Sequence, residues 1–187
     1  MMMTTIEYDE RQLIALVREK AIQFGTFRLA SGQLSNFYLD CRKLTLDSAA
    51  TNLIAAGMWE KFQGNVPAAV GGMAVGAVPI VASILCLAGL RQIPLCGFFV
   101  RKEAKDHGTG KLIEGPVSPG QTVIIVEDVV TTGGSCVAAI AAARAFGLVV
   151  DHAICIIDRQ PGNHPEFDRI GVRLDSLLTL DQLELRS

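Results

Sequence analysis

Apolar residues recur along this chain with two different periods. Between residues 10 and 24 they fall at Leu13, Ile14, Leu16, Val17 and Ala21, which is the spacing of one face of a helix. Short continuous apolar runs predict strands at 66–70, 94–100, 122–126 and 149–157. Helices are expected at 48–61, 77–90 and 135–146. A further strand is expected within 27–46, after the turn-forming residues of that segment.

Because the predicted strands are continuously apolar, we expect both of their faces to be buried, as in a parallel sheet covered by helices. The 187 residues contain no internal repeat, low-complexity tract or linker, so the sequence predicts a single α/β domain over 1–187. In such sheets ligands bind beyond the carboxyl ends of the strands. The residues that follow each strand are therefore the candidates for function.

Composition and charge exclude several classes of protein. Half of the residues are hydrophobic and 19% are charged, which excludes a disordered chain. The net charge of −2 argues against a broad basic surface for nucleic acid. The uncharged stretch 62–90 is long enough for a membrane span, but prolines and glycines interrupt it, which favours a strand, a glycine loop and a helix.

The cysteines and the N-terminus indicate the compartment. The five cysteines contain no CxxC pair, so they match neither a disulfide framework nor a common zinc spacing. The N-terminus lacks the apolar segment of a signal peptide. We therefore expect reduced cysteines and a cytoplasmic location.

Glycines follow the first strand, and basic residues follow the second. Residues 71–79 read GGMAVGAVP, which allows a ligand close to the backbone or simply makes a tight turn. Residues 101–111 read RKEAKDHGTGK. Their cations suit phosphates and their two glycines permit hinging, so we expect a mobile anion-binding loop; a solvated hydrophilic loop is the alternative.

The sharpest pattern, EDVVTTGGS at 127–135, follows the third strand. Its hydroxyls and glycines at the start of a helix suit one phosphate group. Glu127 and Asp128 suit sugar hydroxyls or a nearby cation, so the segment as a whole suits a ribose 5-phosphate. The alternative is a capped helix preceded by solvated acids. Arg159, after the fourth strand, suits a planar anionic group or a surface ion pair with Asp158. His152 and His164 receive no role.

These segments resemble those of the type I phosphoribosyltransferases. VIIVEDVVTTGGS at 123–135 is similar to the phosphoribosyl-pyrophosphate (PRPP) signature of that family, and RKEAKDHGTGK to the catalytic loop of its orotate-specific members. FGTFRLASGQLSNFYLD at 24–40, GGMAVGAVP and IIDRQPG occur in the family's order and spacing. The resemblance covers about residues 24–162.

The resemblance implies the type I phosphoribosyltransferase fold, with a mostly parallel central sheet flanked by helices and a small N-terminal hood. The first helix and the hood would span about 1–46, and the core about 47–187. The implied activity is transfer of the 5-phosphoribosyl group from PRPP to orotate, which gives orotidine 5′-phosphate and pyrophosphate in UMP biosynthesis. The resemblance also implies Mg²⁺ carried on PRPP rather than in a protein metal site. It further implies a cytoplasmic homodimer that shares its catalytic loop between subunits, with no nucleic acid or membrane partner.

Each matching residue takes a role by the same resemblance. Lys102, Lys105 and His107 would be catalytic, and together with Arg101 they would bind the pyrophosphate of PRPP. Glu127 and Asp128 would hold the ribose hydroxyls. Thr131 and Arg159 would contact orotate. The 5-phosphate would be bound by Val129, Val130, Thr131, Thr132, Gly133, Gly134 and Ser135.

The sequence departs from the family at two places. Ala30 stands where many members have a lysine, and Gln33 and Leu34 stand where some have basic residues, so PRPP contacts from this segment are left open. Ala74 and Val75 stand where some members have tyrosine and lysine, so only backbone contacts are expected there.

Two other functions remain open. A phosphoribosyltransferase for uracil or a purine base would share these segments, because base choice depends on residues such as Phe37, Tyr38 and Arg159. A PRPP-sensing regulator that binds RNA or DNA without catalysis would keep the same fold. The net charge and the basic loop argue against the regulator.

Overall fold

The structure is a computed structural model of the 187-residue chain, and it describes residues 6–28, 34–103 and 112–185. Its helical elements are α1 (Glu10–Leu16), a π-helical turn (Val17–Ala21), α2 (Arg42–Thr45), α3 (Ser48–Phe62), α4 (Ala77–Leu90), α5 (Gly134–Phe146) and α6 (Pro165–Ile170). Its strands are β1 (Ile22–Arg28), β2 (Leu34–Leu39), β3 (Ala69–Met73), β4 (Cys96–Val100), β5 (Ile113–Glu114), β6 (Thr122–Val130), β7 (Val149–Asp158) and β8 (Arg173–Thr179).

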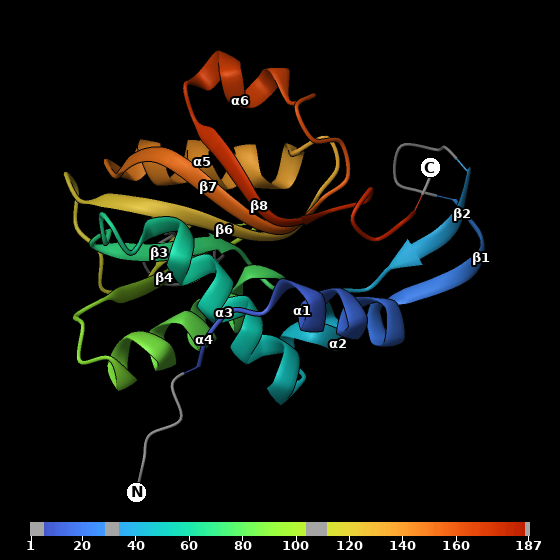
Figure 1. Ribbon diagram of the computed structural model, residues 1–187. Coiled ribbons are helices and arrows are strands. Elements are labelled where there is room, and N and C mark those ends of the chain that lie inside the picture. The colour runs from blue at the N-terminus through green and yellow to red at the C-terminus, as the bar shows by residue number, and fades with distance from the viewer. Residues whose placement is uncertain (1–5, 29–33, 104–111, 186–187) are drawn as a thin grey trace, which may run out of the picture.

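Six strands form the central sheet, in the order β5-β4-β3-β6-β7-β8. All neighbouring pairs are parallel except β4 and β5. Figure 1 shows α1, α3 and α4 on one face of the sheet and α5 and α6 on the other. The antiparallel strands β1 and β2 form a separate hairpin beside this layered body. The arrangement confirms the expected mostly parallel sheet flanked by helices, with a small antiparallel pair of strands at its N-terminal side.

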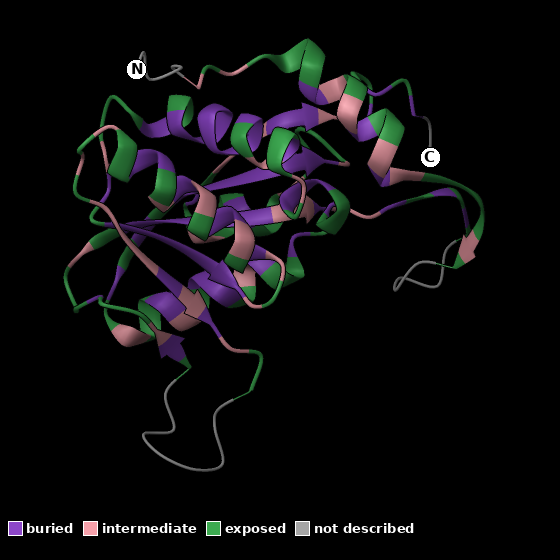
Figure 2. Cartoon of the chain, turned by 90° about the horizontal axis from the view of Figure 1, so that it is seen from below, coloured by how far each residue is buried: buried purple, intermediate pink, exposed green. Residues whose placement is uncertain are grey.

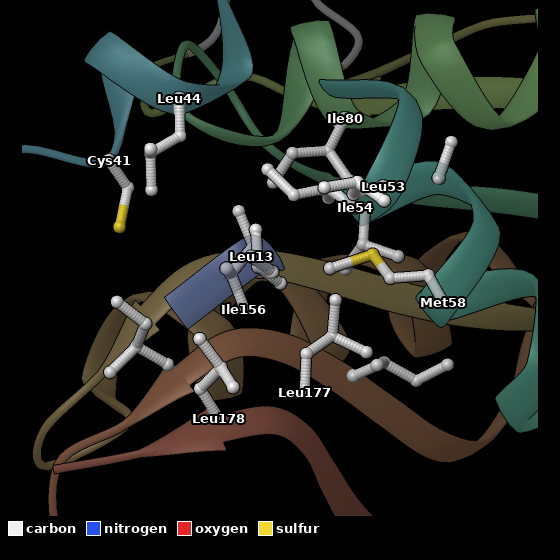
Figure 3. Close-up of a cluster of buried hydrophobic side chains, with 14 of the residues drawn as sticks. Leu13, Cys41, Leu44, Leu53, Ile54, Met58, Ile80, Ile156, Leu177 and Leu178 are labelled. Carbon is white, nitrogen blue, oxygen red and sulfur yellow. The ribbon is translucent and has the colours of Figure 1, made fainter. Parts of the chain in front are cut away.

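Two groups of buried side chains hold the layers together. The larger group joins α1, α3 and α4 to the sheet, and Figure 3 shows Leu13, Ile54 and Met58 facing Ile156 and Leu177. The second group lies under α5 and α6 on the opposite face. Figure 2 shows the central strands buried between helices whose outward sides are exposed. Burial of the strands on both faces explains their continuously apolar sequences.

The hood strand β2 alternates between exposed and buried residues, as a strand with one covered face must. Phe37 and Leu39 point inward, whereas Leu34 and Tyr38 are exposed. β1 begins at Ile22, which pairs with Leu39, so the helix predicted over 10–24 ends earlier than expected.

The strand predicted at 66–70 lies three residues further on, at Ala69–Met73. Gly71 and Gly72 therefore belong to β3 rather than to a ligand loop. Their missing side chains serve packing: a Cβ at Gly71 would lie 2.4 Å from the Phe98 ring, and a Cβ at Gly72 would lie 2.2 Å from the carbonyl oxygen of Val126. The loop that remains between β3 and α4 is 74–76.

β6 is longer than predicted, because its partner β7 continues beside it and pairs Val130 with Asp158. Glu127 and Asp128 therefore lie within β6 and not after it. The sequence also gave no expectation for β5, α6 or β8. Within the described residues, no helix is both long enough and apolar enough to cross a membrane. The uncharged stretch 62–90 contains β3 and α4.

Candidate active site

A cleft of about 280 Å³ lies where the hood meets the carboxyl ends of β3, β4 and β6. The residues that line it are Tyr38, Leu39, Asp40, Cys41, Arg42, Met73, Ala74, Val75, Gly76, Lys102, Glu127, Asp128 and Ser135. A smaller hollow of about 170 Å³ adjoins it and is lined by Glu127 and residues 129–136. Glu127 and Ser135 line both, so the two hollows are neighbouring parts of one site.

The smaller hollow is built around the start of α5. Gly133 is the N-cap residue, with a left-handed φ of 81°, and no side chain caps the helix. The first N–H groups of an α-helix have no partner within the helix. Together with the helix dipole they favour an anion at this position. The hydroxyls of the same segment add further donors, so the hollow is suited to a phosphate group.

Glu127 lines both hollows and Asp128 lines the larger one, and the two carboxylates differ in their surroundings. Glu127 is 6% exposed; its Oε1 accepts a hydrogen bond from the Asp128 backbone N–H at 3.2 Å. Its Oε2 is buried and has no partner among the described residues. Burial, reinforced by the charge of Asp128, raises the pKa of Glu127 to about 7. A buried acceptor without a donor suits a ligand that brings hydroxyl groups.

Asp128 faces the loop at the start of α4. Its Oδ1 accepts a hydrogen bond from the Val129 backbone N–H at 2.8 Å. A Cβ at Gly76 would lie 3.4 Å from its Oδ2, so the carboxylate is close to the backbone of the 74–76 loop. The sequence assigned both acids to one site, but it did not predict that the 74–76 loop lies close to Asp128.

Asp40 is a site residue that sequence reasoning did not assign. Arg42 binds it through two nitrogens, at 2.7 and 3.1 Å, and these hydrogen bonds lower the pKa of the Asp40 carboxyl. Asp40 lines the cleft directly after β2. The alternating pattern of that strand, which is followed by a carboxylate, is the sequence signal that could have identified Asp40.

Arg159 follows β7, and its backbone N–H donates to the carbonyl of Val130 at 2.9 Å, which places it beside Thr131. Its guanidinium lies over the Phe37 ring, 5.2 Å from the centroid. Burial lowers the pKa of this guanidinium. In the described part of the chain it forms no ion pair, and Asp158 binds His164, at 2.8 Å. The surface ion pair between Arg159 and Asp158 considered above is therefore absent from these residues.

The basic segment after β4 is only partly described. Lys102 lines the cleft. Arg101 instead donates to Glu114 at 3.0 Å and lies over the Phe99 ring, so it lines a different hollow. Lys105 and His107 lie outside the described residues, as do Ala30 and Gln33.

An uncapped helix start suited to phosphate lies beside two carboxylates of β6 on a mostly parallel sheet. This is the combination expected of a phosphoribosyltransferase domain. In agreement, the family model for the phosphoribosyl transferase domain matches residues 46–172. An orotate phosphoribosyltransferase of Rhodopirellula baltica is 50% identical over 178 residues, which cover 92% of each chain.

Solved structures agree with this similarity. The orotate phosphoribosyltransferase of Mycobacterium tuberculosis in complex with Fe(III) dicitrate superposes with a TM-score of 0.83 at 36% identity, covering 94% of this chain and 99% of that one. The same enzyme in complex with PRPP gives a TM-score of 0.79 at 33% identity, with the same coverage. The chain therefore belongs to the orotate phosphoribosyltransferases within the phosphoribosyltransferase family.

Proposed function

We propose that this enzyme transfers the 5-phosphoribosyl group from PRPP to orotate, releasing pyrophosphate and forming orotidine 5′-phosphate for UMP biosynthesis. One observation carries the proposal. A phosphate-sized hollow, a carboxylate pair and an arginine that forms no ion pair with any described residue lie together at one edge of the sheet. Each suits one part of the two substrates.

PRPP is bound through its phosphate and its ribose. The 5-phosphate occupies the hollow lined by Val129, Val130, Thr131, Thr132, Gly133, Gly134 and Ser135. The ribose hydroxyls donate to Glu127 and Asp128, which supplies a donor to the buried Oε2 of Glu127, an atom with no partner in the part of the chain that the structure describes. The pyrophosphate extends along the cleft toward Lys102, with Lys105 and His107 as its further contacts. Arg101 would join them only by releasing Glu114, to which it is bound in the structure.

Orotate is recognised by its carboxylate. The planar fork of Arg159 matches a carboxylate with two parallel hydrogen bonds, and the Phe37 ring beneath it holds the guanidinium in place. Thr131 adds a hydroxyl close by. Uracil has no carboxylate, so it would leave the partly buried Arg159 without an anion.

The reaction needs no side-chain nucleophile. The bond from the anomeric carbon to pyrophosphate breaks while the bond to the base nitrogen forms, so negative charge grows on the leaving group. The proton of that nitrogen passes to the leaving pyrophosphate or to water. Lys102, Lys105 and His107 stabilise that charge electrostatically, which is commonly a large contribution to catalysis. Loop closure would also exclude water.

Mg²⁺ is expected to enter with PRPP. No three His, Cys, Asp or Glu side chains converge among the described residues. Mg²⁺ commonly binds through substrate phosphates, one or two carboxylates and its own waters. The cleft carboxylates of Asp40 and Asp128 are the residues that would hold the ion. When bound, the ion neutralises charge on the pyrophosphate.

A homodimer is supported by the outer face of α4. Val78, Leu85 and Phe99 help to line an apolar hollow of about 460 Å³ on that side. Arg101, where the basic loop begins, lies at the same hollow. A second subunit covering this face would meet the loop, so we propose that the loop reaches the neighbouring site.

All five cysteines are free, which supports the cytoplasm as the compartment.

Pyrophosphate release in the presence of PRPP and Mg²⁺ tests the base assignment when orotate, uracil and adenine are compared as acceptors. We expect pyrophosphate release with orotate as the acceptor and none with uracil or adenine. Release with uracil or adenine instead would move the assignment to another base. PRPP binding without release, together with retention of nucleic acid on a filter, would favour the regulator.

A further inference from the structure

Asp158 and His164 form a nearly buried pair behind the orotate arginine. Asp158 is the last residue of β7, and His164 comes directly before α6. The His164 Nε2 lies 2.8 Å from Asp158 Oδ1, and both side chains are 8% exposed. The same oxygen accepts the backbone N–H of Gln160 at 2.9 Å. The pair therefore closes the turn that carries Arg159.

The imidazole has one hydrogen bond in the described part of the chain. Its Nδ1 is buried and has no partner there, so the ring makes its only polar contact with Asp158. Its edge packs on Phe167, with centroids 5.7 Å apart at 73°. Phe167 in turn fills the space at Gly133, where a Cβ would lie 2.4 Å from its ring. The imidazole is thus held between Asp158 and the phosphate hollow.

His164 is the side-chain partner of Asp158, and Arg159 is the next residue along the chain. A carboxylate on a side chain that is 8% exposed is costly to leave with a single backbone donor. Without His164, the cation next to Asp158 along the chain is Arg159. An ion pair between them would compete with a ligand carboxylate for the same guanidinium.

We propose that His164 is a positioning residue for the acceptor base. By occupying the Asp158 carboxylate, it leaves Arg159 available to the carboxylate of the base. The inference rests on the proposed function, in which Arg159 binds orotate.

The test compares His164→Ala, Asp158→Asn and the double variant in steady-state kinetics of the full-length enzyme. His164→Ala should raise the orotate KM about tenfold, the effect of losing one charge-assisted contact, while the PRPP KM and kcat stay within about twofold. Asp158→Asn should stay close to the parent enzyme, because asparagine still accepts from His164 and carries no charge. The double variant should regain the parent orotate KM, because no carboxylate remains to bind Arg159.

Equal loss of orotate affinity in His164→Ala and the double variant would overturn the inference, because it would mean that the imidazole only supports the turn. If His164→Ala fails to fold, His164→Leu fills more of the space beside Phe167 and provides the same comparison with and without Asp158→Asn. Failure of the parent enzyme to consume orotate would instead overturn the proposed function, and that result is seen before any variant is made.

Discussion

Glu127 and Asp128 are neighbours in sequence, yet the fold gives them different electrostatic surroundings. Glu127 is enclosed and its pKa is raised to about 7, from an ordinary value of 4.5. The folded protein therefore favours the protonated form of Glu127, whereas the unfolded chain ionises it near its ordinary value. The stability that this proton provides is present below about pH 4.5 and is lost as the pH rises through about 7.

Glu127→Gln should therefore stabilise the ligand-free protein above pH 7 and have little effect near pH 5. Glutamine removes the charge that burial disfavours but keeps the shape of the side chain. Thermal unfolding at the two pH values measures the difference in Tm. Glu60→Gln, at an exposed carboxyl on α3, is the matched control and should show no such gain. A Tm change of equal size at both pH values would contradict the raised pKa.

A second single residue to test is Lys105, which lies outside the described residues. If it stabilises the leaving pyrophosphate, Lys105→Ala should lower kcat by about 10²–10³ and raise the PRPP KM much less. Lys111→Ala, in the same basic segment, is the control and should change kcat far less. An unchanged kcat with a raised PRPP KM would show that Lys105 only binds the substrate.

Among the secondary-structure elements, α6 and the start of α5 depend on each other. Gly133 combines a φ of 81° with the close approach of Phe167, so any side chain there meets both backbone strain and a clash. Gly134, the next residue, has open space around its Cβ position. The contact makes α6 the support of the phosphate hollow.

Gly133→Ala should destabilise the ligand-free protein by about 2 kcal/mol or more, which corresponds to a fall in Tm of about 4–8 °C. Gly134→Ala should leave Tm unchanged or slightly raised. Thermal unfolding of both variants without substrate makes the comparison. A similar Tm for the two variants would contradict the packing of Phe167 on Gly133.

The same elements show how far the sequence could lead. Continuous apolar runs located β4, β6, β7 and α4 well, because both faces of these strands and much of α4 are buried. β8 was missed because its sequence, RLDSLLT, mixes polar and apolar residues at an edge of the sheet. Gly71 and Gly72 were expected in the loop after the strand, either near a ligand or in a tight turn, since only the fold reveals that Phe98 and Val126 need their space.

The candidate site was predictable to the same extent. EDVVTTGGS and Arg159 each follow or end a strand, so local sequence was enough to select them. Asp40 pairs with Arg42 after β2, and His164 pairs with Asp158 after β7. These pairs depend on the shapes of the two turns, which the sequence alone does not reveal. Arg101 was placed with PRPP, but in the structure it binds Glu114.

For the whole molecule, the main question is whether one site needs two chains. If the basic loop of one subunit completes the site of the other, mixing Lys105→Ala and Asp128→Asn subunits should create some intact sites. Each variant alone should be nearly inactive. Random exchange of subunits should restore about a quarter of the parent activity, because half of the dimers are mixed and each mixed dimer has one intact site.

No recovery after confirmed subunit exchange would show that each chain uses its own loop. A Val78→Asp variant, which places a charge on the outer face of α4, is the companion test by light scattering. It should shift the protein toward monomers. An unchanged dimer mass would show that the interface lies on another face of the protein.

The central claim is tested most directly by following the ultraviolet absorbance of orotate with the purified protein, PRPP and Mg²⁺. The account predicts a loss of orotate absorbance that requires both PRPP and Mg²⁺ and that stops when either is left out. Unchanged absorbance in the complete mixture, with the protein folded and PRPP bound by calorimetry, would contradict it.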